Sequence, residues 1–472
     1  MDLSRLRGEQ TKVLYLEPNK HNVVLGVAGS GKTLIAILRA KYLANLVKEE
    51  NQRVLLTTYS TSLGKYFTLL EEDIPENLDI CVYHKYARGY LKSIGKMTRN
   101  SILGNKKMII EVALNEINLK YQPIRVATLE RPVEIFAEEI TWIEKMGINN
   151  LLDYIDAERI GRGKTRIKRE DRKYFFEVYE KYLELRDRAG FLYDWDDIAI
   201  AVRDELLKDK NERYYKHIVI DEGQDFSPVM IQSLVNSIPE DGSLTFFGDV
   251  AQQIYGNRYS WRDAGIKIGN SGIYKFKYNY RNSKEIWNFA KDITNMPYWK
   301  NDEDILEPME VRAEGPRPML VEFVNANSEL GYLVFYAEMK EKTNRLAILV
   351  RNNKKVHIIL NALKEKNIKC QKIGGGMSKD INEDSIYVGT YHSAKGLEYD
   401  TVMLPFLDKD ELPPKDAVEI HGKDYMLPNE IKLLYVAVTR AKTGLVMSYS
   451  SGKLTELFPI DSENYDKEVF AL

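Results

Sequence analysis

The sequence predicts an α/β protein of at least two lobes, in which strands and helices alternate. Residues 23–25 form a short apolar run that leads through a glycine-rich segment into a helical pattern beginning at Leu34. A second apolar run, residues 217–220, ends in two carboxylates, as strands at the functional edge of a sheet often do. The chain has 472 residues, too many for one core, because single cores stop growing near roughly 250–300 residues.

The composition is that of a soluble globular enzyme, with 44% hydrophobic and 29% charged residues. A net charge of −2 excludes a polycation that coats nucleic acid, so any polynucleotide site must be a local groove. No apolar run approaches the ~20 residues that cross a bilayer, and residues 1–5 lack the apolar segment of a signal peptide. The only cysteines, Cys81 and Cys370, lie far apart, which excludes a disulfide framework and a zinc ribbon. We therefore expect a cytoplasmic protein that does not bind membranes.

A phosphate-binding loop follows the first apolar run. Residues 26–33 match the pattern G-x-x-x-x-G-K-[ST], with a strand before and a helix after. Glycines let backbone N–H groups turn toward an anion, and the helix N-terminus adds partial positive charge. Lys32 is expected to reach the β- and γ-phosphates of ATP, and the Thr33 hydroxyl to bind Mg²⁺. The alternative, a glycine-rich turn that happens to carry Lys and Thr, does not explain the flanking elements. The predicted nucleotide contacts of the loop are Gly26, Ala28, Gly29, Ser30, Gly31, Lys32 and Thr33.

The two carboxylates at the end of the second apolar run complete a P-loop ATPase site. A carboxylate at the end of a strand beside a phosphate-loop strand is where Mg²⁺ is held, which assigns Asp221 to the metal. Glu222 is then the base that orients and activates the attacking water. Acidic residues after a strand are more often ordinary loop residues. Their pairing with the phosphate loop favours the catalytic interpretation.

Further segments narrow the class of ATPase. In order along the chain they are residues 1–10, 57–59, 246–256, 278–282, 388–398 and 434–442. Together with the phosphate loop and the acidic pair, they resemble the motif set of superfamily 1 (SF1A) DNA helicases of the UvrD/Rep/PcrA group. The resemblance implies an ATP-dependent DNA helicase, or DNA-stimulated ATPase, that uses ATP and Mg²⁺.

The resemblance also assigns residues around the γ-phosphate. Arg281 and Arg440 are expected to place two guanidinium groups on it from different sides, because the planar fork of arginine matches phosphate oxygens and stays charged. Gln252 resembles the family's γ-phosphate sensor, which links the nucleotide state to the polynucleotide groove. Taken alone, Arg440 could equally form a surface ion pair of little energetic weight.

Three more residues are assigned to the rest of the nucleotide. Gln10 can pair with the edge of adenine, Tyr280 can stack on its face, and Glu398 is expected on the ribose side. Tyr280 could instead be a core aromatic residue. The joint order of the motifs favours the nucleotide assignments.

The same motifs suggest contacts with single-stranded DNA or a partial duplex. Tyr59, Tyr255, Trp261 and His392 lie in or beside segments that line the DNA channel in relatives, and aromatic faces stack on bases regardless of sequence. For Tyr59 and His392 a packing role is the alternative. A basic stretch, residues 159–173, could contact phosphates or form a solvated surface loop, and the sequence favours neither.

The motif positions predict two RecA-like P-loop NTPase lobes. Residues 1–91 and 190–282 are expected to form the first lobe, 92–189 a helical insertion within it, and 283–472 the second lobe. The second-lobe strands are expected at 346–350, 386–389 and 402–404, and the lobe is expected to end on a strand over residues 444–448. The stretch between Arg281 and Thr390 has no room for the large second insertion (2B) of bigger relatives.

Three functions agree with these features. The first is a 3′→5′ translocase and helicase acting on DNA. The second is a motor that does not unwind DNA and works beside a partner nuclease in DNA repair or phage defence. The third is a nucleotide-gated DNA-binding switch.

Overall fold

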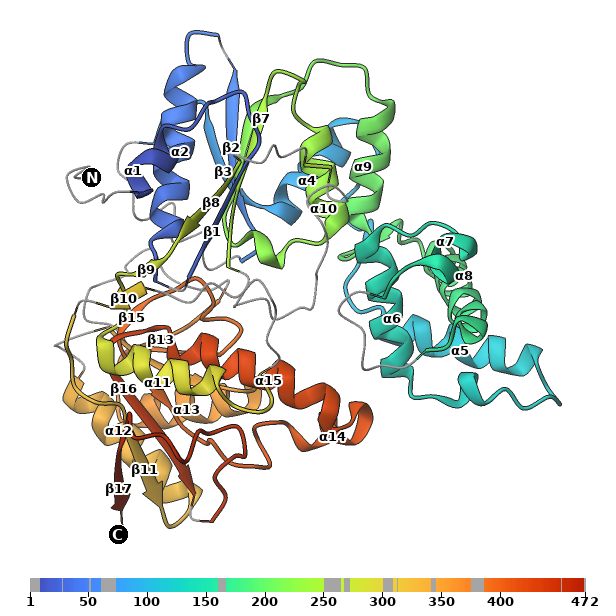
Figure 1. Cartoon of the computed structure of the whole chain (residues 1–472). Helices are drawn as coiled ribbons and strands as arrows, with labels where there is room; N and C mark the ends of the chain where they lie inside the picture. The colour runs from blue at the N-terminus through green and yellow to red at the C-terminus, as the bar shows by residue number, and fades with distance from the viewer. Residues whose placement is uncertain are drawn as a thin grey trace.

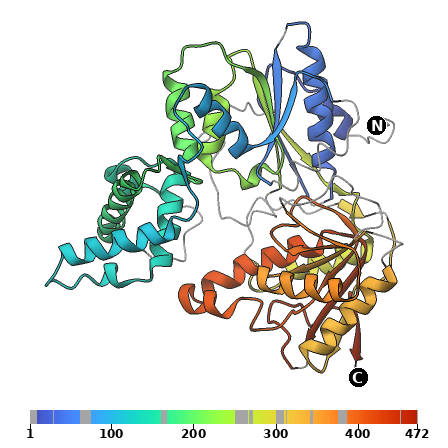
Figure 2. The same ribbon diagram turned by 180° about the vertical axis from the view of Figure 1, so that it is seen from behind.

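The computed structural model of the chain has two lobes, each built around a β-sheet, and a helical body attached to one of them (Figures 1 and 2). The α/β fold class expected from the sequence is confirmed. The residues that the structure describes are 9–27, 29–50, 52–60, 74–159, 167–249, 265–266, 272–299, 309–311, 313–340, 345–374, 386–450 and 452–470.

The first lobe contains a six-stranded sheet in the order β3-β2-β6-β7-β1-β8, and every strand pair is parallel. The strands of this sheet come from two segments of the chain, one before and one after the helical insertion. The strands are β1 (Asn22–Gly26), β2 (Arg53–Thr58), β3 (Leu78–Val82), β6 (Tyr215–Ile220), β7 (Ser243–Gly248) and β8 (Ile273–Phe276). The helices are α1 (Glu9–Leu14), α2 (Lys32–Leu46), α4 (Tyr83–Ser93), α9 (Ile198–Lys208) and α10 (Pro228–Asn236), with the 3-10 turn η4 (Gly223–Asp225).

Helices cover both faces of this sheet because its central strands are apolar on both sides. In β6, Ile218 and Ile220 pack toward α4, α9 and α10, whereas Val219 between them packs toward α1 and α2. All three side chains are fully buried. Because parallel strands end at the same edge, the segments after β1, β2, β6 and β7 meet there, and that edge carries the motifs.

The insertion is a helical body with its own core, in which the rings of Phe136 and Phe175 stack with centroids 4.4 Å apart. Its helices α5 (Lys107–Lys120) and α8 (Arg172–Arg188) contact each other. The elements are β4 (Ile102–Leu103), α5 (Lys107–Lys120), η2 (Ala127–Glu130), α6 (Val133–Met146), α7 (Leu151–Asp156), η3 (Arg169–Asp171), α8 (Arg172–Arg188) and β5 (Tyr193–Asp194).

A buried ionic network fixes the insertion where the chain returns to the first lobe. Lys106 contacts Glu144 at 2.5 Å and Asp196 at 2.7 Å, and Arg186 contacts Asp197 at 2.5 Å. Charges removed from water are tolerated only when paired, and these carboxylates already have Lys106 and Arg186 as partners. The network therefore acts as a structural junction.

The second lobe contains a seven-stranded parallel sheet in the order β13-β14-β12-β15-β16-β11-β17. Helices α11 and α15 cover one face, and α12 and α13 cover the other. The strands are β11 (Met319–Phe323), β12 (Leu346–Val350), β13 (Cys370–Lys372), β14 (Ile386–Thr390), β15 (Tyr399–Leu404), β16 (Ala441–Ser450) and β17 (Asp466–Phe470). The helices are α11 (Lys284–Thr294), α12 (Ala326–Lys340), α13 (Asn353–Glu365), α14 (Lys415–His421) and α15 (Lys423–Val438).

The expectation that this lobe ends on a strand over residues 444–448 is wrong. The strand is longer, β16, and the chain continues into β17, which pairs with β11 at the edge of the sheet. Every residue of β17 is exposed, so it lacks the apolar alternation by which a strand is recognised in a sequence.

The lobes are connected through a short strand pair, and the second lobe also contacts the insertion. The short strand β9 (Tyr278–Asn279) leads out of the first lobe and pairs with β10 (Met309–Val311). Across the other side, His421 of α14 lies 3.2 Å from Glu138 of the insertion helix α6. Among the described residues between Arg281 and Thr390, every helix and every strand except β10 belongs to the second lobe, so no second inserted domain occurs there. No described helix is long and apolar enough to span a membrane.

Candidate nucleotide site and DNA-binding surface

The phosphate loop joins the end of β1 to the start of α2. Gly29 and Gly31 adopt φ angles of 74° and 82°, a left-handed region that favours glycine. A Cβ atom at Gly29 would lie 2.2 Å from Oδ1 of Asn279, so only glycine fits there. The loop is therefore shaped by backbone conformation and by contact with the segment that joins the lobes.

Lys32 lies at the mouth of this loop. Its Nζ donates to the carbonyl oxygens of Gly26 at 2.7 Å and Val27 at 2.8 Å, and lies 3.5 Å from Oδ2 of Asp249. The ammonium group is nearly buried. It is held where the backbone N–H groups and the N-terminus of α2 converge, as binding of an anionic phosphate requires.

Asp221 follows β6 at the same edge of the sheet. Its side chain is 1% exposed, and neither carboxylate oxygen accepts a hydrogen bond of normal geometry from the residues that the structure describes. Burial, followed by the negative charge of Glu222, raises the pKa of Asp221 to about 7, while the neighbouring Thr33 hydroxyl acts in the opposite direction. Two buried, unsatisfied acceptor oxygens beside a hydroxyl are the donor set that Mg²⁺ prefers.

We expect Asp221→Asn to stabilise the nucleotide-free protein at pH 8 and to abolish Mg²⁺-dependent ATP hydrolysis. The pKa of Asp221 in the folded state lies above its ordinary value of 3.8. The folded chain therefore binds more protons than the unfolded chain between about pH 4 and pH 7. As the pH rises through that window, buried Asp221 loses its proton and the free energy of unfolding falls. Thermal denaturation at pH 4.5 and pH 8 measures this. The gain in Tm should be larger at pH 8, and an equal gain at both pH values would contradict it.

Glu222 is the next residue, and its backbone is strained. Its φ of 52° places a non-glycine residue in the left-handed region, which costs free energy and is common at functional sites. Gln224 donates to its carboxylate and also accepts from the backbone N–H of Asp249 at 2.8 Å. Gln224 thus holds Glu222 in a fixed position between β6 and β7.

Cations from both lobes set the charge of Glu222. Burial acts to raise its pKa, but the positive charges of Lys395, Lys32 and Arg440 outweigh burial, and its pKa lies below the ordinary value. Lys395 and Arg440 belong to the second lobe and Lys32 to the first. Glu222 is therefore an ionised carboxylate at neutral pH, as a general base must be.

Arg281 and Arg440 lie at the seam between the lobes. Arg281 contacts Glu398 at 2.5 Å, and its Nε is buried without a hydrogen-bond partner. Arg440 is 1% exposed and donates to the carbonyl of Val436 at 2.9 Å. Burial, then the charge of Arg281, lowers the pKa of Arg440 to about 10. Two guanidinium groups close enough to repel each other define a place where an anion is stabilised.

Glu398 lies beside these arginines. Burial acts to raise the pKa of Glu398, but the positive charges of Arg281 and Lys442 outweigh burial and lower the pKa to about 2. Lys442 lies 3.5 Å from the same carboxylate. In this structure Glu398 positions Arg281, whereas the resemblance assigned it to the ribose.

Gln10 and Tyr280 flank the phosphate loop. Nε2 of Gln10 donates to the carbonyl of Ser30 at 3.0 Å, and the backbone N–H of Tyr280 donates to the carbonyl of Gly29 at 2.9 Å. The Tyr280 ring is 45% exposed, so it is not a core aromatic residue. The side chain of Gln10 and the backbone of Tyr280 thus contact the loop, and their adenine roles stay predictions. The expected contacts Ala28, Gln252, Tyr255 and Trp261 lie outside the described residues.

A row of aromatic rings extends from the motif edge of the first lobe to the insertion. Tyr59, just after β2, lies 5.6 Å from His84, and His84 lies 5.3 Å from Trp195. Nε2 of His84 is also 2.9 Å from the carbonyl of Trp195. Trp195 is 40% exposed although tryptophan is usually well buried. These three residues, here called the aromatic row, offer π-faces beside the nucleotide edge.

The other expected DNA contacts among the described residues are His392 and part of the basic stretch 159–173. His392 is half-buried, and burial with the charges of Arg351 and Lys395 lowers its pKa to about 4, so it is neutral. In the basic stretch, Arg159 binds Glu139 at 2.6 Å, and Arg172 donates to the Tyr154 carbonyl at 2.6 Å. These two cations stabilise the insertion from inside and are not available to DNA phosphates.

The sequence analysis missed three features of the site. Asp225 and Lys395 form a buried ion pair across the lobes. Asn282 ties the seam to the second lobe by donating to the Ala441 carbonyl at 2.5 Å. Trp195 belongs to the aromatic row. A tryptophan in the polar run 193–197, where a buried strand would not place it, is the signal that could have identified Trp195.

The residues present fit ATP and Mg²⁺. The observations that support this are the glycine cradle, the two unsatisfied oxygens of Asp221 and the buried free N–H of Arg281. Lys32, Arg281 and Arg440 would hold the phosphates, and Thr33 and Asp221 would hold the metal, which supplies charge neutralisation at the phosphates when bound. This geometry defines the class as a P-loop ATPase with its site between two lobes.

Comparison with known proteins identifies the family. The UvrD/REP helicase N-terminal domain matches residues 6–277, and the UvrD-like helicase C-terminal domain matches 274–378 and 375–452. The chain therefore belongs to the UvrD/Rep family of helicases, as the motifs implied, and proteins of this family are ATP-dependent DNA helicases.

Relatives differ in how much of their length the chain spans. It is 22% identical over 463 residues to a probable DNA helicase of Mycoplasma pneumoniae, covering 91% of this chain and 80% of the relative. It is 28% identical over 231 residues to DNA helicase II of Haemophilus influenzae, covering 44% and 30%. It is 24% identical over 372 residues to the ATP-dependent DNA helicase Rep of Buchnera aphidicola, covering 73% and 54%. The chain thus spans about half or less of these last two relatives.

Proposed function

We propose that the protein is an ATP-driven motor that moves along single-stranded DNA in the 3′→5′ direction. The observation that carries the proposal is that the site is built from both lobes: Lys395 and Arg440 of the second lobe place their charges near Glu222 of the first, and Lys395 forms an ion pair with Asp225 across the seam. Separation of the lobes removes those charges from the base. Hydrolysis is therefore favoured only when the lobes are closed, which couples the chemistry to a relative movement of the lobes.

The aromatic row is the proposed surface on which the movement of the lobes acts on DNA. Tyr59 follows β2, and the Thr57 carbonyl in the same strand accepts a hydrogen bond from the Asp221 N–H at 2.9 Å. A base stacked on Tyr59 would thus lie beside a strand that is hydrogen-bonded to the metal-binding acid. Trp261 and Tyr255 remain proposed DNA contacts from the motif resemblance alone.

The test is the steady-state ATPase rate of the chain with and without single-stranded DNA, with Lys32→Ala as the inactive control. Strong stimulation that disappears in Lys32→Ala supports a DNA-coupled motor. Absence of stimulation would instead support a nucleotide-gated switch. Oligonucleotides of RNA in the same assay distinguish DNA from RNA as the stimulating strand.

A second candidate function is translocation without unwinding, beside a partner nuclease or another DNA repair or phage-defence protein. The observation that favours it is the compact second lobe, because the described residues between Arg281 and Thr390 form no further domain. Unwinding assays on duplexes with a 3′ or a 5′ tail separate the two candidates and report the direction. Stimulated ATPase activity without strand separation on either substrate supports the second.

We expect Trp195→Ala to weaken binding of single-stranded DNA while leaving the basal ATPase rate unchanged. Loss of one stacked base costs about 1–3 kcal/mol, which is roughly a fivefold to 150-fold weaker affinity. Fluorescence anisotropy with a labelled oligo-dT measures the affinity. Phe335→Ala, which removes a 56% exposed ring from α12 in the second lobe, is the matched control. Equal affinities for the two variants would assign Trp195 to packing.

A further inference from the structure

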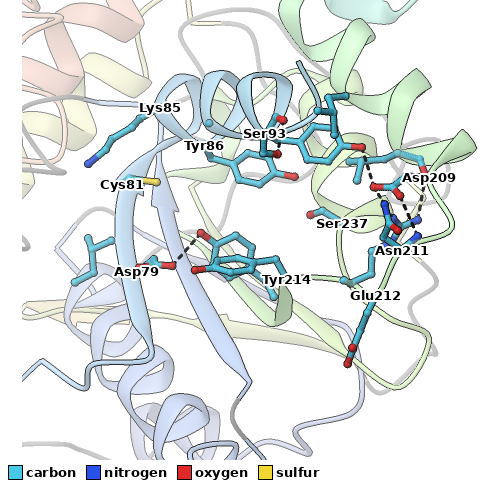
Figure 3. A pocket seen from close by; sticks show the side chains of 17 residues that line it. Asp79, Cys81, Lys85, Tyr86, Ser93, Asp209, Asn211, Glu212, Tyr214 and Ser237 are labelled. Atoms are coloured by element: carbon cyan, nitrogen blue, oxygen red, sulfur yellow. Dashed lines mark hydrogen bonds and ion pairs between the residues drawn. The ribbon is translucent and has the colours of Figure 1, made fainter. Parts of the chain in front are cut away.

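A pocket of about 630 Å³ lies in the first lobe, away from the nucleotide site. Its wall is formed by the edge strand β3, by α4, by the end of α9 and by the loop that leads into β6 (Figure 3). Asp79 and Tyr215, which line it, are at the beginnings of β3 and β6. All strands of this sheet are parallel, so the pocket is at the opposite edge from the phosphate loop and Asp221.

The pocket wall is mainly apolar and is held in place by its own contacts. Tyr215 donates to Asp79 at 3.0 Å, and Asp79 also accepts from Arg53 at 2.6 Å. The Arg53 guanidinium lies 5.6 Å above the ring of Tyr214. On the other side, Tyr90 donates to Asp209 at 3.2 Å. Because these rings are already fixed, a ligand would enter without paying the cost of ordering them.

The pocket opens along a sheet edge. Among the described strands β3 pairs only with β2, and its residues after Leu78 are only half-buried. Asp79, Ile80 and Cys81 are consecutive residues of β3 that line the pocket, although alternate side chains of a strand point to opposite faces. The backbone edge of β3 is therefore itself part of the pocket wall.

An extended peptide satisfies both features. An unpaired strand edge offers N–H and C=O groups to an added strand, and a pocket beside it selects one side chain of that strand. Glu212 lies at one end of the pocket, is exposed, and makes no ion pair among the described residues (Figure 3). It would attract a basic residue next to the inserted side chain.

We propose that this pocket is a docking site for an extended segment of a partner protein, which adds a strand to β3 and inserts a large apolar or aromatic side chain. A partner bound here leaves the phosphate loop and the aromatic row uncovered. The site does not depend on the motor function and would serve an ATPase of any kind.

Gly89 supplies a clean test. It lies within α4 at the margin of the pocket, and an added Cβ atom there meets no atom within 4 Å. Replacement of a glycine inside a helix also favours the helix by about 0.5–1 kcal/mol. Gly89→Trp should fold and fill the pocket entrance. Gly331→Trp is the matched control, because Gly331 lies in α12 of the second lobe and also has open space around it.

The experiment is selection of a displayed library of random linear peptides on the full chain, with removal of those that bind Gly89→Trp. We expect enriched peptides with an aromatic or large apolar residue beside Lys or Arg. A synthetic enriched peptide should bind the wild type and Gly331→Trp equally and Gly89→Trp at least about tenfold more weakly.

Hydrogen exchange then distinguishes the occupants. Strand addition should protect those backbone amides of residues 79–82 that point away from β2, whereas a ligand that only fills the cavity should not. Enrichment of no peptide that discriminates between the two proteins would overturn the proposal. Discriminating peptides that leave those amides unprotected would overturn strand addition. Unchanged ATPase activity in Gly89→Trp separates failure of the docking site from failure of the proposed motor.

Discussion

Glu222→Gln should lower the rate of ATP hydrolysis by about 10²–10⁴-fold while ATP still binds. Glutamine keeps the size of the side chain and can still contact Gln224, but it cannot accept a proton from the attacking water. The pKa of Glu222 is lowered by cations from both lobes, so the wild-type residue is ionised and able to act as the base. Single-turnover hydrolysis measures the chemical step, and binding of a fluorescent ATP analogue measures affinity.

Glu240→Gln is the control for this change, because it removes an exposed carboxylate from the same lobe. Its hydrolysis rate should equal that of the wild type. Glu222→Gln should also hold ATP for longer and, with it, the closed arrangement of the lobes. If Glu222→Gln still hydrolyses ATP at the wild-type rate, Glu222 is not the base.

Arg281→Ala should lower the hydrolysis rate by about 10³-fold or more, since arginines that stabilise phosphoryl transfer contribute on the order of 10³–10⁵. The guanidinium is held by Glu398, and its Nε is buried without a partner. Arg440 is expected to approach the γ-phosphate from a different side, so it would not replace this donor. The steady-state ATPase rate in the presence of single-stranded DNA measures the effect.

Lys442→Ala is the matched control for Arg281→Ala. It removes the other cation beside Glu398 but leaves both arginines in place. Its rate should stay close to that of the wild type, and its Tm should show that the seam still folds. A loss in Lys442→Ala as large as that in Arg281→Ala would mean that the net charge around Glu398, not the guanidinium of Arg281, governs the rate.

Glu222 and Arg281 lie at the same seam, and its contacts show how the two lobes act as a unit. The Gly29 carbonyl accepts from Tyr280, and Asp225 of the first lobe forms an ion pair with Lys395 of the second. Burial raises the pKa of Asp225 to about 6 although Lys395 lowers it. A buried pair of this kind is costly to separate, because each charge would then lack its partner.

Local sequence predicted the elements whose signals are local. Strands such as β12 and helices such as α5 carry their apolar periodicity within a few turns or pleats of chain, so their positions could be read directly. The phosphate loop is a contiguous motif, and the left-handed φ angles of Gly29 and Gly31 already favour glycine within it. The positions of Gly29, Gly31 and Lys32 could therefore be assigned to a phosphate site before any fold was known.

Features that depend on distant partners could not be predicted this way. The exposed strand β17 forms only because β11 offers it an edge. Arg159 and Arg172 resembled free cations in the sequence, but the insertion folds carboxylate and carbonyl acceptors around them. Trp195 lies beside His84, the neighbour of Tyr59, only when the insertion returns the chain to the first lobe.

The sequence by itself determined the family and the fold class and predicted the residues of the nucleotide site, because these follow from residue type and order along the chain. The tertiary structure decided the ionisation of Glu222 and Asp221, the pairing of Arg281 with Glu398 and the exposure of Trp195. The physical reason is that a pKa and a stacking surface depend on which charges and how much water surround a group. Those surroundings come from segments far apart in the sequence that meet only in the folded chain.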